Sequence, residues 1–473
     1  MTDTGTRTNP DVVDVVALGE SMVTFLPTRT GRLADVPSFD RAIGGAESNV
    51  ACVLAAAGHS TRWVSRVGAD GFGDHLVRAI GAYGVDVDSV RRDPARPTGI
   101  YFRTAGDRAG DDHEVAYYRA GSAASAMSVD TVDPAALRAA RILHLSGITA
   151  ALSAGCLDLL RALTAPRPGR RPLVSFDVNF RPGLWREAAA PRVLLDLARG
   201  CDLVFVGTDE AEAAWGVTPD PDAIRALLPE PRTLVVKQGA HGATVFERAD
   251  VADTDRVYGV GGAGGVARTD PLDAVRAAGP SGANDAVDVE VLGSADGVGG
   301  VGGAHGAGGT RGADPVGDPG RSGDVGRAGN TRSERTGSGP GPGSGPGRTA
   351  SEPGRATRPA TTPDSPGSVP AADTRTFVPA LYVDVVAPVG AGDAFAAGFL
   401  SATLRGRSVR ERIRSGHLMA AAALTVPGDL AVPPSRDHAD RLIALDDAAW
   451  RRLRLGPGWT HAEGRADQEV PTP

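Results

Sequence analysis

The sequence predicts an α/β fold, in which a three-layer α/β/α domain with a mainly parallel sheet carries a small β-sheet lid and a long disordered insertion. Between residues 11 and 258, strand-like runs rich in β-branched residues alternate with amphipathic or Ala-rich runs of helical character. The strand-like runs are apolar on both faces, which favours a parallel sheet covered by helices on both sides. The third observation is a stretch after residue 260 that is poor in apolar residues.

The elements of the main domain follow in chain order from these runs. Strands are predicted for 12–26, 61–68, 141–147, 173–180, 202–207 and 233–239. Helices are predicted between them for 47–58, 153–165, 191–200 and 220–228. Two stretches, about 31–45 and 97–122, alternate apolar and polar residues instead, and we expect them to pair as the small β-sheet lid.

Ordered patterning stops near residue 260 and resumes before residue 377. No aromatic residue, Ile, Met or Lys occurs between Tyr258 and Phe377, so this segment cannot bury enough apolar surface to offset its chain entropy. Beyond it we expect a strand and a helix within 377–404, a helix and a turn within 410–429 and a terminal helix over 438–453. The predicted organisation is a disordered N-terminus (1–10), one folded domain (11–260 and 375–456), a disordered insertion (261–374) and a polar tail (457–473).

Charge and cysteine usage exclude several classes of protein. The formal net charge of −7 argues against a nucleic-acid or membrane partner, since either favours a basic face. The three cysteines, Cys52, Cys156 and Cys201, are far apart, so neither a zinc site nor a disulfide framework is indicated. The N-terminus does not match a signal peptide, and no run of about 18 apolar residues occurs. We therefore expect a cytoplasmic protein.

Lys237 is the only lysine among the 50 basic residues. Lys237 either remains by chance in a composition biased toward Arg, or it occupies a site that requires a compact ammonium group rather than a guanidinium. The same residue excludes a P-loop, because that motif needs Ser or Thr after its Lys and Gln238 follows here.

The stretch VGAGDAFAAGF, residues 389–399, is the clearest candidate for chemistry. A glycine-rich turn that opens a helix leaves backbone N–H groups without partners, and the helix dipole adds partial positive charge, so an anion is favoured there. Asp393 is then either a helix cap or a base that takes a proton from an attacking hydroxyl. The position after a strand in an α/β sheet, where ligands usually bind, favours the second interpretation.

At this point the chain resembles the ribokinase-like (PfkB) carbohydrate kinase family. Residues 389–399 are similar to the C-terminal signature of that family, and IGGAESNVACVLAAAG, residues 43–58, is similar to the N-terminal one. The resemblance covers about 12–258 and 376–450. It implies a ribokinase-like fold, a kinase that uses ATP and Mg²⁺, and a small-molecule sugar as the second substrate.

The resemblance also implies roles for individual residues. Asp393 would be the general base, and the backbone of Gly390, Ala391 and Gly392 would form the anion hole for the transferred phosphoryl group. Glu210 would organise Mg²⁺ through water. Lys237 and Gly239 would line the nucleotide phosphates. Gly44, Gly45 and Asn49 would face the sugar, although Asn49 could also be an ordinary amide on a helix surface.

Further stretches resemble the 2-keto-3-deoxygluconate kinases within this family. They are GIYFRT, VAYYRAGSAAS, HLSGITAAL and SFDVNFRPGLW. By this resemblance Tyr101, Tyr117, Arg119 and Arg181 contact the acid end of the sugar, and Asp429 accepts a distal hydroxyl. The arginines suit a substrate that carries a carboxylate.

Two positions depart from the family pattern. Ala387 stands where the family usually has an Asp that helps to form a monovalent-cation site, so potassium activation is doubtful. Gly207 replaces the Asn of the NxxE motif, which weakens the network of metal-bound waters but leaves Glu210.

Three alternatives to a 2-keto-3-deoxygluconate kinase are a fructokinase or related sugar kinase, a sugar-sensing protein that has lost turnover, and a dinucleotide-dependent oxidoreductase. Arg119 and Arg181 argue against the first, because a substrate without a carboxylate would leave them unpaired. An intact Asp393 argues against the second. The third lacks a glycine fingerprint at the first strand. An exposed strand of the lid could pair with that of a second copy and form a homo-oligomer.

Overall fold

The computed structural model of the chain describes residues 12–29, 31–104, 114–166, 172–185, 190–248 and 373–461. All of them belong to one compact unit, and the second unit, 292–369, lies outside the described residues. The predicted disordered N-terminus, most of the predicted insertion and most of the predicted polar tail also lie outside them. These three predictions therefore stay predictions.

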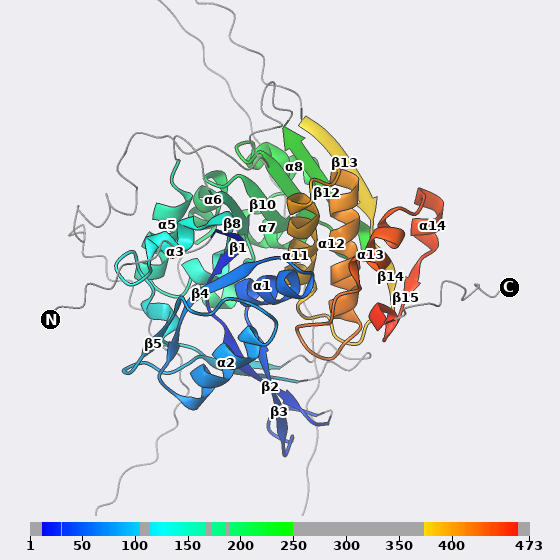
Figure 1. Ribbon diagram of the computed structural model, residues 1–473. Coiled ribbons are helices and arrows are strands. Elements are labelled where there is room, and N and C mark those ends of the chain that lie inside the picture. The colour runs from blue at the N-terminus through cyan, green and yellow to red at the C-terminus, as the bar shows by residue number, and fades with distance from the viewer. Residues whose placement is uncertain are drawn as a thin grey trace, which may run out of the picture. The chain divides into compact units, whose positions relative to one another are not determined.

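A nine-stranded sheet forms the centre of the described unit (Figure 1). Its strands are β1 (Val13–Leu18), β4 (Thr61–Gly68), β5 (Val90–Asp93), β8 (Ala140–Ser146), β9 (Leu173–Asp177), β10 (Leu203–Gly207), β11 (Thr233–Lys237), β12 (Gly242–Arg248) and β13 (Asp373–Pro379). Their order is β13-β12-β11-β10-β9-β8-β1-β4-β5. Only the β11–β12 and β12–β13 pairs are antiparallel, which confirms the predicted mainly parallel sheet.

Helices cover both faces of this sheet, as predicted. The helices are α1 (Ala46–Ala56), α2 (Gly71–Gly81), α3 (Pro134–Arg138), α4 (Gly147–Ala150), α5 (Ala154–Thr164), α6 (Ala190–Arg199), α7 (Thr208–Trp215), α8 (Pro221–Leu227), α11 (Ala391–Leu404), α12 (Val409–Leu424), α13 (Arg436–Ile443) and α14 (Asp447–Arg452). In Figure 1, α1, α11 and α12 lie side by side on one face. Side-chain caps begin several helices, for example Ser153 before α5 and Ser408 before α12.

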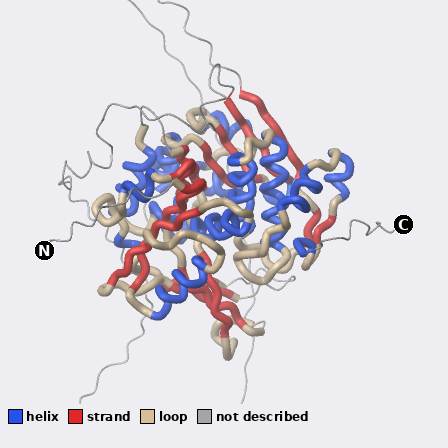
Figure 2. Tube along the Cα trace, viewed as in Figure 1, coloured by secondary structure: helices blue, strands red, loops and turns tan. Residues whose placement is uncertain are grey.

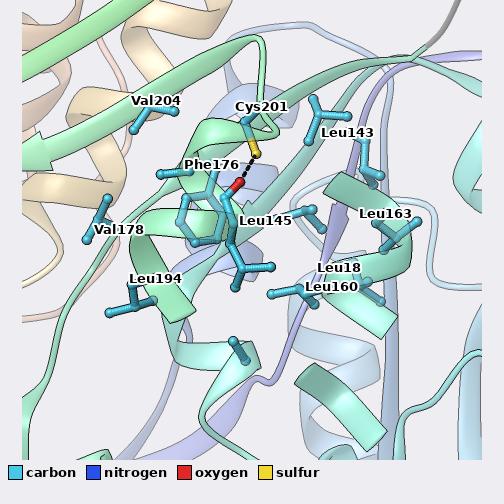
Figure 3. Packing of buried hydrophobic residues seen from close by; sticks show 14 of the residues in the cluster. Leu18, Leu143, Leu145, Leu160, Leu163, Phe176, Val178, Leu194, Cys201 and Val204 are labelled. Carbon is cyan, nitrogen blue, oxygen red and sulfur yellow. Dashed lines mark hydrogen bonds between the residues drawn. The ribbon is translucent and has the colours of Figure 1, made fainter. Parts of the chain in front are cut away.

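Alternate residues of the strands fill two separate hydrophobic layers. Val15, Ile142 and Phe205 pack against α11 and α12, whereas their neighbours along the strands pack toward α5 and α6 on the opposite face. Figure 3 shows part of the second layer, with Leu143, Leu145, Phe176, Val178 and Val204 pointing toward Leu160, Leu163 and Leu194. The Cys201 thiol lies in this layer and donates to the carbonyl of Leu197. Burial on both faces explains why the strands are apolar throughout.

A second sheet of four strands projects below the main domain in the view of Figure 2. It contains β2 (Met22–Pro27), β3 (Phe39–Gly44), β6 (Ile100–Arg103) and β7 (Val115–Tyr118), in the order β3-β2-β6-β7. Three of these strands lie in the stretches predicted as a lid. The prediction of one strand over 12–26 is wrong, because the chain leaves the main sheet after Leu18 and enters the lid at Met22. Gly19 permits this bend, since a Cβ atom there would lie 2.1 Å from the Glu47 side chain.

The C-terminal part differs from the prediction in three details. β13 begins at Asp373, inside the stretch predicted as insertion, and pairs with β12 so that Asp373 faces Arg248. The predicted single terminal helix is two helices, α13 and α14, because the Asp446 side chain caps a new helix by accepting from the Ala449 N–H. Trp459 is buried, so packed chain extends beyond residue 456.

Two further short strands, β14 (Tyr382–Val383) and β15 (Arg454–Leu455), pair in parallel. The 3₁₀ turns are Ala124–Ala126, Pro182–Leu184, Gly239–His241 and Trp459–His461. Across the described ranges, every helix is too short or too polar to cross a membrane.

Candidate active site

The glycine-rich turn of residues 390–392 begins α11. Gly390 has a φ of +72°, in the left-handed region that favours glycine. A Cβ atom on Gly390 would lie 2.2 Å from the carbonyl oxygen of Asp429, so no larger residue fits. The first N–H groups of α11, beginning with those of Ala391 and Gly392, lack partners inside the helix and attract an anion together with the helix dipole.

Asp393 lies in the first turn of the same helix and is partly buried. Its Oδ2 accepts a hydrogen bond from Nδ2 of the buried Asn49 on α1, at 2.9 Å. Burial raises the pKa of Asp393 to about 7, and the negative charges of Asp177 and Asp429 add to this effect. The Asn49 amide and the Lys237 ammonium act in the opposite direction. A carboxyl group with this pKa can accept a proton near neutral pH.

Lys237 ends β11 and forms an ion pair with Asp177, which ends β9. The Lys237 Nζ lies 3.1 and 3.0 Å from the two carboxylate oxygens. Burial alone would lower the pKa of Lys237, but Asp177 and Glu210 raise it above its usual value, so the ammonium stays charged. A Cβ atom on Gly392 would lie 3.7 Å from Nζ, which places this charge beside the turn.

Asp177 is a site residue that the sequence reasoning missed. It is buried at the carboxyl end of an otherwise apolar strand, where ligands of α/β sheets bind. An acid in this position was the signal that could have identified it.

Glu210 lies at the start of α7 beside the same ion pair. Its Oε2 accepts from the backbone N–H of Gly207 at 2.9 Å, and its Oε1 lies 3.4 Å from Nη1 of the exposed Arg181. Glu210 therefore caps its own helix and meets Arg181, which the sequence resemblance assigned to the sugar. Within the described ranges, no group of three or more His, Cys, Asp or Glu side chains is arranged to hold a metal ion.

Gly44 and Gly45 connect β3 of the lid to α1. A Cβ atom on Gly44 would lie 2.2 Å from the hydroxyl of Tyr101 and 2.7 Å from Oδ2 of Asp429. The Tyr101 hydroxyl donates to that Oδ2 at 2.9 Å, and Nη2 of Arg103 donates to Oδ1 at 3.0 Å. Tyr101 and Asp429 thus face the same part of the site. Arg103, two residues after Tyr101 on the same strand face, was missed by the sequence reasoning.

Arg119 pairs with Glu20, another residue that the sequence reasoning missed. The Glu20 Oε2 accepts from Nε of Arg119 at 2.8 Å and lies 2.5 Å from Nη2, while Oε1 accepts from the Ser122 hydroxyl at 2.5 Å. Glu20 is almost fully buried in the connection between β1 and β2. Arg119 also lies 5.9 Å from the ring centre of the exposed Tyr117.

The predicted residues therefore form two adjoining groups. Asp393, Asn49 and Lys237 surround the glycine-rich turn, and Gly44 and Tyr101 surround the Asp429 side chain. The Asp429 backbone joins the groups through its contact with Gly390.

Of the remaining predicted positions, Tyr117 lies beside Tyr101, with ring centroids 5.4 Å apart, and Glu210 lies beside Lys237. Arg119 and Arg181 each have a separate carboxylate partner. Gly239 is exposed, with a φ of +55°, in the turn that follows Lys237. Ala387 is buried, and its N–H donates to the Leu424 carbonyl at 3.4 Å.

Comparison with known proteins places this arrangement in context. The family described as pfkB family carbohydrate kinase matches residues 13–264 and 359–436. The chain is 35% identical over 238 residues to a 2-dehydro-3-deoxygluconokinase of Thermoproteus tenax, covering 50% of this chain and 72% of that protein. It is 35% identical over 234 residues to the Bacillus subtilis protein of the same name, covering 49% and 72%. Fructokinase-1 of Zea mays is 30% identical over 239 residues, covering 50% and 73%.

Solved structures agree with the fold. The chain is similar to a PfkB protein from Polaromonas sp. JS666, with a TM-score of 0.56 and 25% identity over 90% of this chain and 99% of that one. It also shares its fold with an uncharacterized sugar kinase from Pyrococcus horikoshii in complex with ATP, with a TM-score of 0.56 and 17% identity over 92% and 99%. The predicted ribokinase-like fold is confirmed by these similarities.

Proposed function

The chain belongs to the pfkB family of carbohydrate kinases, and we propose that it uses ATP to phosphorylate the terminal hydroxyl of 2-keto-3-deoxygluconate, also called 2-dehydro-3-deoxygluconate. The observation that carries the chemistry is Asp393, a carboxyl group with a pKa raised to about 7 at a glycine-rich helix start. Phosphoryl transfer needs a base beside a site for developing negative charge, and this arrangement supplies both.

Asp393 acts as the general base in this proposal. The sugar hydroxyl gives its proton to Asp393 while its oxygen attacks the γ-phosphorus, and the bond from that phosphorus to the β–γ bridging oxygen breaks to release ADP. Asn49 holds the Oδ2 atom of Asp393, which leaves Oδ1 to face the hydroxyl. Holding Asp393 in one orientation increases the rate of phosphoryl transfer, because the attacking and leaving oxygens must be in line with the phosphorus.

The turn of residues 390–392 and Lys237 bind the phosphates of ATP. Backbone N–H groups at the start of α11 donate to the transferred phosphoryl oxygens, and the Lys237 ammonium offsets the charge of the neighbouring phosphates. Gly239 lets the chain turn beside them with its left-handed backbone. A Pyrococcus horikoshii sugar kinase with the same fold is known in complex with ATP, which supports ATP as the phosphoryl donor.

Mg²⁺ fits the acidic groups beside Lys237. Both Asp177 and Glu210 act on the Lys237 ammonium, and Mg²⁺ is usually bound by one or two carboxylates, waters and substrate phosphates. When bound, Mg²⁺ neutralises charge on the phosphates. Glu210 would hold it through water, because its Oε2 already accepts from the Gly207 N–H.

The keto-acid assignment rests on the relatives at 35% identity and on the arginines at the lid and sheet edge. Arg181 has an exposed side chain and a loose partner in Glu210, so its guanidinium is available to a carboxylate. Arg119 is paired with Glu20, whose Oε2 binds its Nε and Nη2 atoms. In this proposal the Nη1 atom of Arg119 binds the substrate. Asp429 would accept a hydrogen bond from a distal hydroxyl of the sugar, with the Tyr101 hydroxyl beside it.

A fructokinase is the second candidate, and the pairing of Arg119 with Glu20 favours it. If Glu20 neutralises Arg119 completely, the site attracts a carboxylate less strongly. Fructokinases are also among the relatives, at 30% identity for the Zea mays protein. A sugar-sensing protein without turnover remains a third outcome of the test below.

The test is ATP turnover against 2-keto-3-deoxygluconate, 2-keto-3-deoxygalactonate, fructose, ribose and adenosine. The wild type and Asp393→Asn are compared, with Arg181→Met as a second variant. We expect keto acids to be preferred, the preference to fall in Arg181→Met and turnover to fall by about 10³-fold in Asp393→Asn. Preference for fructose in the wild type would overturn the keto-acid proposal but keep the role of Asp393. Binding of a sugar without turnover would favour the sensor.

A further inference from the structure

Arg103 is a buried arginine of the lid, and its side-chain partners among the described residues all belong to another part of the chain. Its side chain is 6% exposed, and its Nη2 donates to Oδ1 of Asp429 and to the carbonyl of Pro427, both at 3.0 Å. Its Nε is buried without a partner among the described residues. Burying a guanidinium is costly unless specific partners receive it, so this contact ties β6 to the segment after α12.

Asp429 is held on two sides. Its side chain accepts from Arg103 at Oδ1 and from the Tyr101 hydroxyl at Oδ2, so both oxygens are bound to β6 of the lid. Its backbone packs on the glycine-rich turn so closely that a Cβ atom on Gly390 would lie 3.0 Å from the Asp429 carbonyl carbon. Asp429 therefore contacts β6 through its side chain, and through its backbone it lies against the residue that caps α11, three residues before Asp393.

We propose that Arg103 is a positioning residue that couples the lid to the catalytic turn by holding Asp429 against Gly390. When β6 is in place, Arg103 keeps Asp429 oriented for the sugar and keeps the turn in its anion-binding shape. The proposal rests on the proposed kinase chemistry but does not depend on which sugar is phosphorylated.

The positive charge of Arg103 should also affect the pH–rate profile, which a purely structural arginine would not do. The groups that face Asp393 are Asn49 on α1, Asp177 on β9, Lys237 on β11 and Asp429 after α12. The groups that face Asp429 are Arg103 and Tyr101 of β6 and Asp393 of α11.

The direction of the expected shift in the pH–rate profile follows from the carboxyl groups of Asp429 and Asp393. Burial raises the pKa of Asp429, and Arg103 opposes that increase. Without Arg103, Asp429 gains a proton more readily, so its negative charge raises the pKa of Asp393 less. The acid limb of the pH–rate profile, which reports the deprotonation of Asp393, then moves to lower pH.

The experiment compares Arg103→Met and Arg103→Lys with the wild type. Arg103→Met should lower kcat/KM for the sugar by about 100-fold, since misplacing a catalytic group by about 1 Å has this effect. It should also move the acid limb to lower pH. Arg103→Lys keeps the positive charge, so the acid limb should return toward its wild-type position and part of kcat/KM should recover.

Arg225→Met is the matched control. Arg225 on α8 is also a buried arginine that binds one carboxylate and backbone carbonyls, those of Leu228 and Pro231. Its carboxylate partner, Asp373, begins β13 at the opposite edge of the main sheet from β5. This variant should lose stability without a change in kcat/KM or in the acid limb. An unchanged acid limb and an unchanged kcat/KM in folded Arg103→Met would overturn the proposal.

A readout without turnover separates this proposal from the assignment of the substrate. The free energy of unfolding is measured as a function of pH for four proteins. They are the wild type, Asp393→Asn, Arg103→Met and the double variant Arg103→Met/Asp393→Asn, so that each Asp393→Asn protein is compared with its parent that retains Asp393. Because the raised pKa of Asp393 costs stability, the parent should be less stable than Asp393→Asn above about pH 4, and this deficit should shrink in Arg103→Met. An equal deficit in both backgrounds would contradict the proposal, whichever sugar is phosphorylated.

Discussion

Gly390 provides the sharpest test of the catalytic turn, because the chain contains a matched glycine elsewhere. Gly390→Ala places a Cβ atom 2.2 Å from the Asp429 carbonyl oxygen and 3.1 Å from its Cα, at a φ of +72°. Gly406→Ala has a similar φ of +68° but meets no heavy atom within 4 Å. Both variants force alanine into the left-handed region, which costs about 1 kcal/mol. Only Gly390→Ala adds a collision with backbone.

The size of the effect follows from that collision. A Cβ atom cannot approach closer than about 3.2 Å, so the Asp429 backbone or the turn must move by about 1 Å in Gly390→Ala. A displacement of this size at a catalytic group lowers kcat/KM by about 100-fold, or about 2.7 kcal/mol of transition-state stabilisation. Gly406→Ala should lose about 1 kcal/mol of unfolding free energy and keep kcat/KM within about twofold.

The assay couples ADP release to the oxidation of NADH and is paired with urea unfolding of each variant. Subtracting the stability change of Gly406→Ala from that of Gly390→Ala isolates the cost of the collision. If Gly390→Ala keeps the kcat/KM of Gly406→Ala, then contact between the turn and Asp429 is not required for phosphoryl transfer, and the reasoning is refuted.

Three further predictions concern the base, the lysine and the segment that joins β12 to β13. Asp393→Asn should lower kcat by about 10³-fold, and the wild-type kcat/KM should rise with pH to a plateau above about pH 7 in a pH–rate profile. Since a raised folded-state pKa costs stability as pH increases, this variant should also unfold at higher urea than the wild type at about pH 8 and equally at about pH 3. Lys237→Met should raise the KM for ATP about tenfold or more, measured by initial-rate kinetics, because Asp177 then lacks its cation. An unchanged KM would show that Lys237 does not bind the nucleotide. Replacing residues 249–372 with an Asn-Gly turn should keep kcat/KM within about threefold. The reason is that Arg248 and Asp373, which face each other, lie at the end of β12 and β13 opposite the end that adjoins Lys237. A large loss of kcat/KM would assign this segment a role in catalysis.

The sequence was sufficient for the fold class because its evidence is local. Apolar strands such as 61–68 and 203–207 alternate with helical runs, and a strand that is apolar on both faces requires helices on both sides. The glycine-rich turn was also recognisable as a candidate site, since a glycine-rich helix start that carries an acid is written in consecutive residues. Asp393 and Gly390 are therefore identifiable as candidates from these residues alone, whereas Asn49 became a candidate only through the resemblance to the kinase family.

Strand boundaries at the lid were less accessible, because hydrophobic pattern alone does not show where a chain changes sheets. The run 12–26 looks like one strand, and only the packing of Gly19 against Glu47 shows the bend between β1 and β2. The same limit applies to α13 and α14, whose apolar residues continue one pattern across the Asp446 cap.

By itself, then, the sequence determined the layered α/β architecture, the kinase family and the residues of the glycine-rich turn, because periodicity and contiguous motifs carry that information. Tertiary structure decided which side chains meet. Asp177 binds Lys237 across the sheet, Glu20 engages Arg119, and Arg103 holds Asp429 over a separation of 326 residues. Such contacts depend on how distant elements pack, and the free energy of a buried charge depends on the partner that packing brings to it.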